Sequence, residues 1–437
     1  MSAAPAAIVG RKLQSLDGLR ALAIILVFFH HMQSDHFPVL NRPTFFIKAY
    51  IAQGWIGVDL FFVLSGFLIT GILLHTREPS NYFTGFYARR VLRIFPLYYL
   101  VLTGIIVTSQ ILTNAHAQSA PEIAALVPLP EDRWVYFCYL TNWTRLWKAH
   151  WDSHFASILA HFWSLAVEEQ FYVFWPFIVW IVRPRTIPWV AGIVAGLSAM
   201  IRLAWVAHAG LQIVPPQLVE IQLATICRLD ALFIGALCAC FFRDPKLMLR
   251  IHKWLPWIAS MGVGSFFLTY SGMLFFPPRN GLSVEDATRV FMLCGGYTLL
   301  ALGFGALVLL AAYTEIKTTL MQKFLKSRWL APIGAYSYGI YVFHVPILGV
   351  GNVYVFPKIA RGASTVRELA FTQCAYIIVL TAVTFAISAL SHEFFEKKFL
   401  RFKRYFEAKT NTKTNTAPAS REIIVDDPAV AQESVVV

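Results

Sequence analysis

The chain has 437 residues, of which 57% are hydrophobic and only 14% are charged, and its mean hydropathy is +0.58. A soluble domain carries about 25% charged residues, so this composition excludes an ordinary soluble protein and predicts one that crosses a membrane several times. The formal net charge of +13 does not indicate nucleic-acid binding, because basic residues gather at the cytoplasmic ends of apolar spans. The six cysteines show no CxxC or Cys/His spacing, so no metal site is predicted and they are expected to pack in the core.

Ten apolar runs are long enough to span a membrane, for which about 20 residues are needed. The runs cover residues 19–34, 54–75, 95–113, 164–182, 187–208, 224–242, 254–273, 290–313, 333–353 and 369–392. If the N-terminus is cytoplasmic, most Lys and Arg residues between the runs also fall on the cytoplasmic side, as is usual in membrane proteins. We therefore predict an all-α polytopic membrane protein with about ten transmembrane helices and both termini in the cytoplasm.

The other segments complete this organisation. Residues 1–12 are expected to form a cytoplasmic N-terminal segment, residues 13–400 the membrane domain, and residues 401–437 a basic and then disordered cytoplasmic tail. An eleventh apolar run, at 133–147, is short and interrupted by polar residues, so we expect it to lie on the outer interface or dip into it. The first run is expected to be retained, because no small-residue cleavage site follows it.

Charged side chains inside the runs are the main functional signal, because a charge at the centre of a membrane helix costs about 2.5–3.5 kcal/mol. The first stretch, residues 17–31, reads DGLRALAIILVFFHH. A helix advances by about 100° per residue, which places Arg20 and His31 on one face, with Asp17 nearby and His30 turned about 80° away from Arg20. His31 is therefore the candidate catalytic histidine, and a hydrogen-bonded packing role is its alternative.

The second stretch, residues 57–71, reads GVDLFFVLSGFLITG. Asp59 and Ser65 interrupt its apolar run, and Gly66 and Gly71 are expected to allow close approach of another helix. Asp59 belongs either to a functional site or to a buried pair that holds two helices together.

The third stretch, residues 86–100, reads FYARRVLRIFPLYYL and contains Arg89, Arg90 and Arg93. One explanation is that the three arginines anchor the helix at the cytoplasmic face. The other is a phosphate clamp, because a guanidinium group presents a forked pair of donors that matches phosphate oxygens.

The fourth stretch reads HFWSLAVEEQFYVFWPF and contains the adjacent Glu168 and Glu169. Ser164 lies four residues before Glu168 and shares its helix face. Two neighbouring carboxylates in a low dielectric do not both ionise easily without a partner, and we expect Arg228 or Arg202 to supply it. A structural ion pair is the alternative to a site role.

The fifth stretch, residues 337–348, reads SYGIYVFHVPIL. Ser337, Tyr341 and His344 follow one another at i, i+4 and i+7, so they lie along one helix face. Taken alone, these three residues favour packing and hydrogen bonding over catalysis.

Together and in this order, the stretches resemble the membrane acyltransferase family three, which contains bacterial polysaccharide and lipopolysaccharide O-acetyltransferases. The resemblance covers roughly residues 13–400 and rests on SLDGLRALAIILVFFHH, GWIGVDLFFVLSGFLIT, FYARRVLRIFPLYY, HFWSLAVEEQFYVFWP, RLDALFIGALCA and SYGIYVFHVPIL. It implies a ten-helix acyltransferase domain in the bacterial inner membrane. It also implies transfer of an acyl group, usually acetyl from acetyl-CoA, to a hydroxyl of an extracytoplasmic glycan or glycolipid.

The resemblance also implies roles for single residues. The family's arginine, ten residues and histidine fit Arg20 and His31, and its Arg-x-x-Arg pattern, associated with acyl-CoA, fits Arg90 and Arg93. Around these four we place the remaining candidates: Asp17, Asp59, Glu168 and Glu169 as catalytic partners of the histidine, Arg89 as a further donor contact, and Ser164, Tyr341, His344 and Arg228 as substrate contacts.

The predicted mechanism has Arg90 and Arg93 holding the phosphates of a cytoplasmic acyl-CoA while His31 acts as general base on the acceptor hydroxyl. Histidine suits that task because it titrates near neutral pH. A covalent acyl-histidine or acyl-serine relay is the alternative. Some relatives carry a fused periplasmic domain, so this chain is expected either to complete the transfer alone or to pass the acyl group to a separate periplasmic protein. The Trp-rich outer loop, residues 114–163, is our candidate for acceptor contact.

A transporter or flippase for a glycan lipid or a small metabolite is the main rival function. Buried charges and ten spans fit it equally, although the sequence lacks the internal repeat of many transporters. The discriminating property is chemical, since a transporter does not cleave the acyl-CoA thioester. A purely structural membrane subunit is disfavoured by the cost of so many buried charges.

Overall fold

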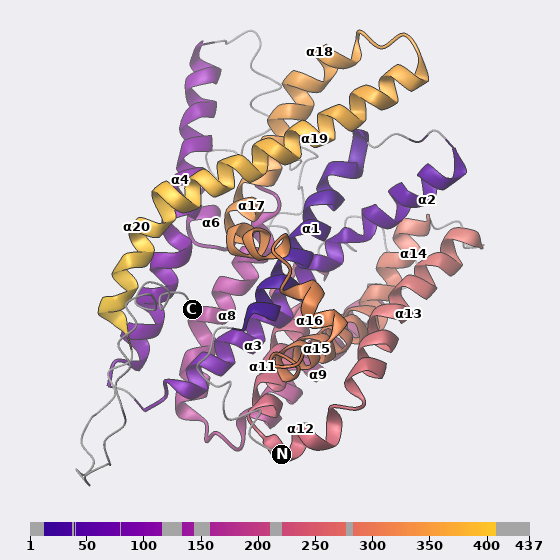
Figure 1. The fold of residues 1–437 in the computed structure, drawn as a ribbon. Coiled ribbons are helices and arrows are strands. Elements are labelled where there is room, and N and C mark those ends of the chain that lie inside the picture. The colour runs from indigo at the N-terminus through magenta and orange to yellow at the C-terminus, as the bar shows by residue number, and fades with distance from the viewer. Residues whose placement is uncertain are drawn as a thin grey trace.

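The computed structural model describes residues 13–36, 39, 41–78, 80–115, 133–143, 158–209, 221–276 and 283–407. Within these ranges the regular elements are all helices and no strand is formed (Figure 1). The predicted all-α class is therefore confirmed for the described part of the chain.

The helices run as follows in chain order: α1 (Gln14–His36), α2 (Arg42–Ile51), η1 (Ala52–Ile56), α3 (Gly57–His75), α4 (Tyr82–Ala115), α6 (Arg133–Phe137), α8 (Phe162–Ile181), α9 (Ile187–Ala209), η4 (Thr225–Cys227), α11 (Leu229–Phe242), α12 (Pro245–Ile251), α13 (Leu255–Phe275), α14 (Val284–Phe291), η5 (Met292–Gly296), α15 (Tyr297–Tyr313), α16 (Leu320–Leu325), α17 (Leu330–Val350), η6 (Gly351–Val355), α18 (Phe356–Ala360), α19 (Val366–Ser391), η7 (His392–Glu396), α20 (Lys397–Leu400) and η8 (Arg401–Phe406). Of these, η5, η6 and η7 are short π-helical turns, and η1, η4 and η8 are 3₁₀ turns.

Eight helical segments of the described chain are long and apolar enough to cross a membrane. They are Gln14–Met32, Arg42–His75, Tyr82–Ile111, Ile187–His208, Leu255–Phe275, Val284–Tyr313, Leu330–Ala360 and Val366–Phe406. The other two predicted runs also form helices, but α8 carries two glutamates and α11 has only 14 residues. A multi-pass architecture is therefore supported, whereas the count of ten and the cytoplasmic position of the termini stay predictions.

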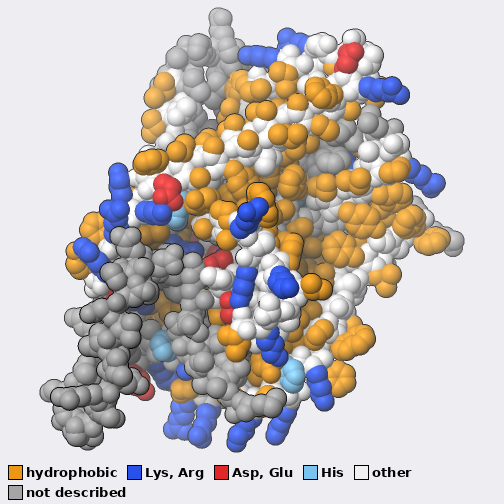
Figure 2. Space-filling view, in the orientation of Figure 1, with side chains coloured by type: hydrophobic (Ala, Val, Ile, Leu, Met, Phe, Trp, Pro, Cys, Tyr) orange, Lys and Arg blue, Asp and Glu red, His pale blue; other side chains and the backbone are white. Residues whose placement is uncertain are grey.

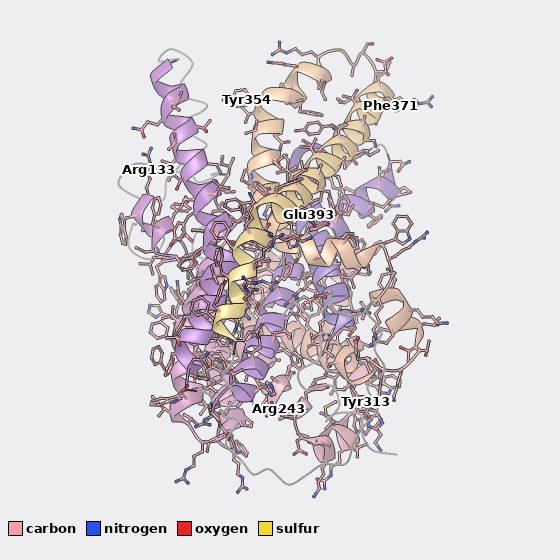
Figure 3. The ribbon with its side chains drawn as sticks, turned by 60° about the vertical axis from the view of Figure 1, so that its left-hand side comes forward. Arg133, Arg243, Tyr313, Tyr354, Phe371 and Glu393 are labelled. Carbon is pink, nitrogen blue, oxygen red and sulfur yellow. The ribbon has the colours of Figure 1, made fainter. Side chains whose placement is uncertain are left out.

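Hydrophobic side chains cover much of the upper and right-hand parts of the visible face, and Lys and Arg side chains gather along its lower edge and also stand at its upper edge (Figure 2). Arg243 lies at this lower end of the molecule, whereas Tyr354 and Phe371 lie near the opposite end (Figure 3). Such a band of apolar surface with a basic rim is typical of a membrane protein.

Helix α1 packs against α3, α17, α15 and η1, and α3 packs closely against α11. Two glycines account for the closeness of the α3–α11 contact. A Cβ atom at Gly66 would lie 1.9 Å from the Leu232 carbonyl oxygen, and one at Gly235 would lie 2.1 Å from the Val63 carbonyl oxygen. The predicted role of Gly66 is thus confirmed, but that of Gly71 is wrong, because no atom lies within 4 Å of its Cβ position.

Two segments, residues 133–147 and the tail from residue 401, can be compared in part with their predicted structure. Of residues 133–147, the described part forms the short helix α6 and a turn after it, and the last two residues of α6 accept hydrogen bonds from the Tyr98 and Tyr99 hydroxyls. Residues 144–147 lie outside the described chain, as does most of the loop 114–163. The predicted tail begins differently, since residues 401–406 form η8 and pack against α4. Residues 1–12 and 408–437 are not described.

Candidate functional site

A cavity lies between α1, α3, α4, α8 and α17, and it holds about 820 Å³ of atom-free space including its open part. Its polar lining consists of Arg20, Ser65, Arg90, Arg93, Ser164, Glu168, Tyr172, Ser337, Tyr338 and Tyr341, and its apolar lining comes chiefly from α3. The structure thus brings residues from five distant parts of the sequence to one site.

Two arginines of α4 make this cavity attractive to an anion. Arg90 and Arg93 lie about one helical turn apart, and neither forms a hydrogen bond or an ion pair with any other described residue. The Arg90 guanidinium carbon lies 5.6 Å from the centre of the Tyr172 ring. Nearby Arg20 is different, because its Nη1 atom lies 2.8 Å from Asp17 Oδ1. A phosphate group would supply the acceptors that the two α4 guanidinium groups lack.

Arg89, the third arginine of this cluster, does not line the cavity. It donates a hydrogen bond to the Phe406 carbonyl oxygen in η8 instead. Its predicted role in donor binding stays a prediction, and its observed contact is structural.

The two adjacent glutamates of α8 have different surroundings. Glu168 lines the cavity and accepts hydrogen bonds from Ser65 Oγ at 2.8 Å and from the Tyr172 hydroxyl at 3.2 Å. Glu169 is buried but is not part of the lining, because consecutive helical residues point about 100° apart. Ser164 and Glu168 both face the cavity, as their spacing predicts.

The arginine expected to pair with these glutamates pairs elsewhere, so that prediction is wrong. Arg228 Nη2 lies 2.7 Å from Asp59 Oδ1, and Arg202 Nη2 lies 2.9 Å from Asp230 Oδ2. Glu168 instead receives two neutral hydroxyl donors. The sequence could not distinguish these partners, because each pair joins helices whose contact depends on the whole topology.

The Asp59–Arg228 pair is deeply buried, with side-chain exposures of 1% and 2%. It joins α3 to the start of α11, and the Arg228 guanidinium carbon lies 3.8 Å from the centre of the Tyr297 ring. Neither residue lines the cavity. The predicted roles of Asp59 in catalysis and of Arg228 in substrate binding stay predictions. In the structure, the two residues form an ion pair with each other.

Three histidines form a cluster beside the inner end of the cavity. The ring centres of His31 and His344 are 4.9 Å apart, and those of His344 and His161 are 5.0 Å apart. His344 is fully buried and His161 nearly so. The His30 ring centre also lies 4.9 Å from that of His31, but its Nδ1 atom lies 2.6 Å from the Ala52 carbonyl oxygen of η1. The two adjacent histidines of α1 therefore face different elements, as the helical spacing predicts.

The hydrogen-bond partners assign the protons on two of these rings. His344 Nδ1 lies 2.7 Å from the Tyr341 carbonyl oxygen, so it carries the proton and leaves Nε2 as an acceptor. His31 Nδ1 lies 2.9 Å from the Val27 carbonyl oxygen and 3.3 Å from His344 Nε2. Its proton serves both acceptors, so the basic nitrogen of neutral His31 is Nε2.

His31 is not among the lining residues, but hydrogen-bonded side chains connect the cavity to the histidine cluster. The Ser164 and Tyr341 hydroxyls lie 2.5 Å apart, and the Tyr341 hydroxyl donates to the His161 carbonyl oxygen at 2.7 Å. Tyr341 and His344 lie three residues apart on α17. Tyr341 faces the cavity, and His344 contacts His31. The predicted substrate contacts Ser164 and Tyr341 thus meet at the end of the cavity nearest the histidines.

Sequence analysis missed four residues of this site, which are Ser65, His161, Tyr172 and Tyr338. Tyr172 lies four residues after Glu168 and contacts it, so helical spacing could have identified it. Ser65 was noticed only as an interruption of an apolar run, and His161 only as the start of a stretch. A cluster of three or more His, Cys, Asp or Glu side chains fit to hold a metal ion is not found in the described ranges.

Comparison with known proteins gives a consistent result. A family model described as an acyltransferase domain matches residues 13–393. The peptidoglycan O-acetyltransferase OatA of Listeria monocytogenes is 28% identical over 417 residues, which cover 90% of this chain and 57% of the relative. The O-acetyltransferase OatA of Staphylococcus aureus is 28% identical over 355 residues, which cover 79% of this chain and 52% of the relative. The chain spans about half the length of these relatives, and no solved structure matches it at a significant level.

Proposed function

The chain belongs to the acyltransferase family whose domain model matches residues 13–393, and on this premise we propose that it transfers an acetyl group to a hydroxyl of a peptidoglycan-type glycan in the bacterial cell envelope. The names of its relatives support both the acetyl group and the acceptor class. The apolar helices support a place in the cytoplasmic membrane.

We propose acetyl-CoA as the donor, taken from the cytoplasm. The observation that carries this proposal is the cavity with Arg90 and Arg93 in its lining, where neither guanidinium forms an ion pair with a described residue. Arg presents a fork of donors that matches phosphate oxygens. The neutral arm of the donor, which is the uncharged pantetheine part between the diphosphate and the thioester, would extend from these arginines along the apolar surface of α3 towards Ser164 and Tyr341.

The proton assignment on His31 supports its role as the general base. His31 Nε2 would take the proton from the acceptor hydroxyl as its oxygen attacks the thioester carbonyl carbon. The carbon–sulfur bond then breaks, and the CoA sulfur leaves with the proton returned by His31. His344 would hold the imidazole in place and stabilise its cation, because its Nε2 accepts from the His31 Nδ1–H group.

His31→Ala provides the first test, and the adjacent His30→Ala is its matched control. Membranes that contain the intact protein should move labelled acetyl from acetyl-CoA into the glycan fraction. His31→Ala should reduce the rate by about 10²–10⁴-fold, the usual contribution of a general base, whereas folded His30→Ala should keep most of it. Equal rates in both variants would reject the role of His31. An intact thioester with transported donor or glycan lipid would favour the transporter function instead.

The acceptor side of the reaction is the second part of the proposal. The relatives extend beyond the region matched by this chain, so the acetyl group could reach the glycan directly or through a separate periplasmic protein. Purified protein in vesicles, supplied with acetyl-CoA and a peptidoglycan fragment, distinguishes these routes. Transfer to the fragment without any other protein would exclude an obligatory partner.

A further inference from the structure

The C-terminal end of the described chain covers the arginine cluster of α4. This segment, η8 with Glu407, lies beyond residue 393, where the family match ends. Together with α20 it lies beside the first half of α4 (Figure 1). Arg89 donates to the Phe406 carbonyl oxygen, and Asn81 Nδ2 donates to the Glu407 carbonyl oxygen at 2.8 Å. These bonds fix the backbone of the segment against the helix that carries Arg90 and Arg93.

Lys403 is the cation of this segment that turns inward. Arg401 and Arg404 are exposed, whereas Lys403 is partly buried. The largest effects of neighbouring charges on Lys403 are repulsive and come from Arg93, Arg90, Arg89 and Arg20. Lys403 forms no ion pair or hydrogen bond with another described residue.

A cluster of like charges drawn from α1, α4 and η8 opposes folding unless an anion neutralises it. Asp17 pairs with Arg20, and Glu168 and Glu169 attract Arg90 from a distance, but Arg90, Arg93 and Lys403 form no ion pair with a described residue. The ligand that fits must therefore carry several negative charges, and they must be spread over more than one group. CoA has such charges, in a diphosphate next to its neutral arm and in a separate 3′-phosphate on the ribose.

We propose that Lys403 binds the 3′-phosphate of the CoA donor and so extends the donor site beyond the family's own region. This inference rests on the proposed function. The thioester end must lie near Ser164 and Tyr341, so the diphosphate that follows the arm meets Arg90 and Arg93 in the lining. The 3′-phosphate is then left outside the lining, on the side where η8 places Lys403.

The test compares acetyl-CoA with acetyl-3′-dephospho-CoA, which lacks only that phosphate. In the intact protein the KM should be about tenfold lower for acetyl-CoA, as expected for one charge-assisted hydrogen bond. Lys403→Met should raise the KM for acetyl-CoA about tenfold, leave kcat nearly unchanged, and leave the KM for the dephospho donor unaltered. Lys403→Arg should restore the preference, and Arg404→Met, an exposed control in the same segment, should behave like the intact protein.

Three outcomes would overturn the proposal. If Lys403→Met raises the KM for both donors equally, Lys403 has a structural role or binds another part of the donor. If the intact protein uses both donors equally well, no group recognises the 3′-phosphate. In both cases acetyl transfer itself survives, whereas if neither donor is used, the proposed function fails and the Lys403 site fails with it.

A second measurement needs no substitution and covers the case in which Lys403→Met does not fold. Acetyl-CoA should protect Lys403 of the intact protein from an amine-specific reagent, as measured by mass spectrometry. Acetyl-3′-dephospho-CoA at equal saturation should protect it much less. Equal protection by the two donors would contradict the proposal.

Discussion

Replacement of His344 tests whether the histidine pair acts as a unit. Its Nε2 atom lies 3.3 Å from His31 Nδ1 and is positioned to accept the shared proton. His344→Leu fills most of the buried volume but removes this acceptor. His31 would then keep only its bond to the Val27 carbonyl oxygen within α1, which leaves its ring less firmly oriented and its cation less stabilised.

The magnitude follows from the hydrogen bond that is lost. A hydrogen bond to a charged group contributes about 1.5–3 kcal/mol, and each 1.36 kcal/mol changes a rate about tenfold. We therefore expect His344→Leu to lower kcat by roughly 10- to 150-fold. The KM for acetyl-CoA should change little, because His344 is not part of the cavity lining.

The assay is steady-state acetyl transfer with protein normalised for folded amount by thermal unfolding in detergent. His344→Gln keeps an oxygen that can accept from His31 and should recover much of the lost kcat. A purely structural role predicts a lower unfolding temperature and no such recovery. Unchanged kcat in folded His344→Leu would refute the proposed coupling of the two rings.

Three further predictions follow from single contacts. Arg90→Met should raise the KM for acetyl-CoA about tenfold or more with a small change in kcat, which steady-state kinetics will show; an unchanged KM would remove Arg90 from the donor site. Arg228→Met should cost about 3–5 kcal/mol of stability by leaving Asp59 buried and unpaired, and adding Asp59→Leu should recover part of it. Thermal unfolding of the two variants measures both effects, and an unchanged unfolding temperature in Arg228→Met would contradict the prediction. Gly66→Ala should destabilise the protein measurably because α11 lies against it, whereas Gly71→Ala should not, and equal unfolding temperatures would contradict this.

Local periodicity predicted those features of the site that depend on one helix. It separated His31 from His30 and placed Ser164 with Glu168, because a residue's direction on a helix depends only on its position along that helix. It also found the apolar runs, although it could not decide between a span and a shorter buried helix for α11.

Pairings between helices could not be predicted in this way. Arg228 meets Asp59 across 169 residues of sequence, and the alternatives that the sequence offered were the two glutamates of α8. Lys403 is a similar case, because a basic residue near a chain end normally indicates a membrane anchor. Only the structure shows that this lysine, unlike the exposed Arg404, is partly buried in a segment that packs against α4.

The geometry of α1 relates the two halves of the site to each other. Arg20 lines the cavity, and His31 follows eleven residues later, which corresponds to about 16 Å along a helix. Because one continuous helix carries both residues, the distance between the cationic end and the basic nitrogen is nearly fixed. A donor that uses both ends must therefore separate its phosphates from its reacting carbon by a long neutral arm. Acetyl-CoA has this construction, whereas a short donor such as acetyl phosphate would reach only one end, so the arginines and His31 could not act on it together.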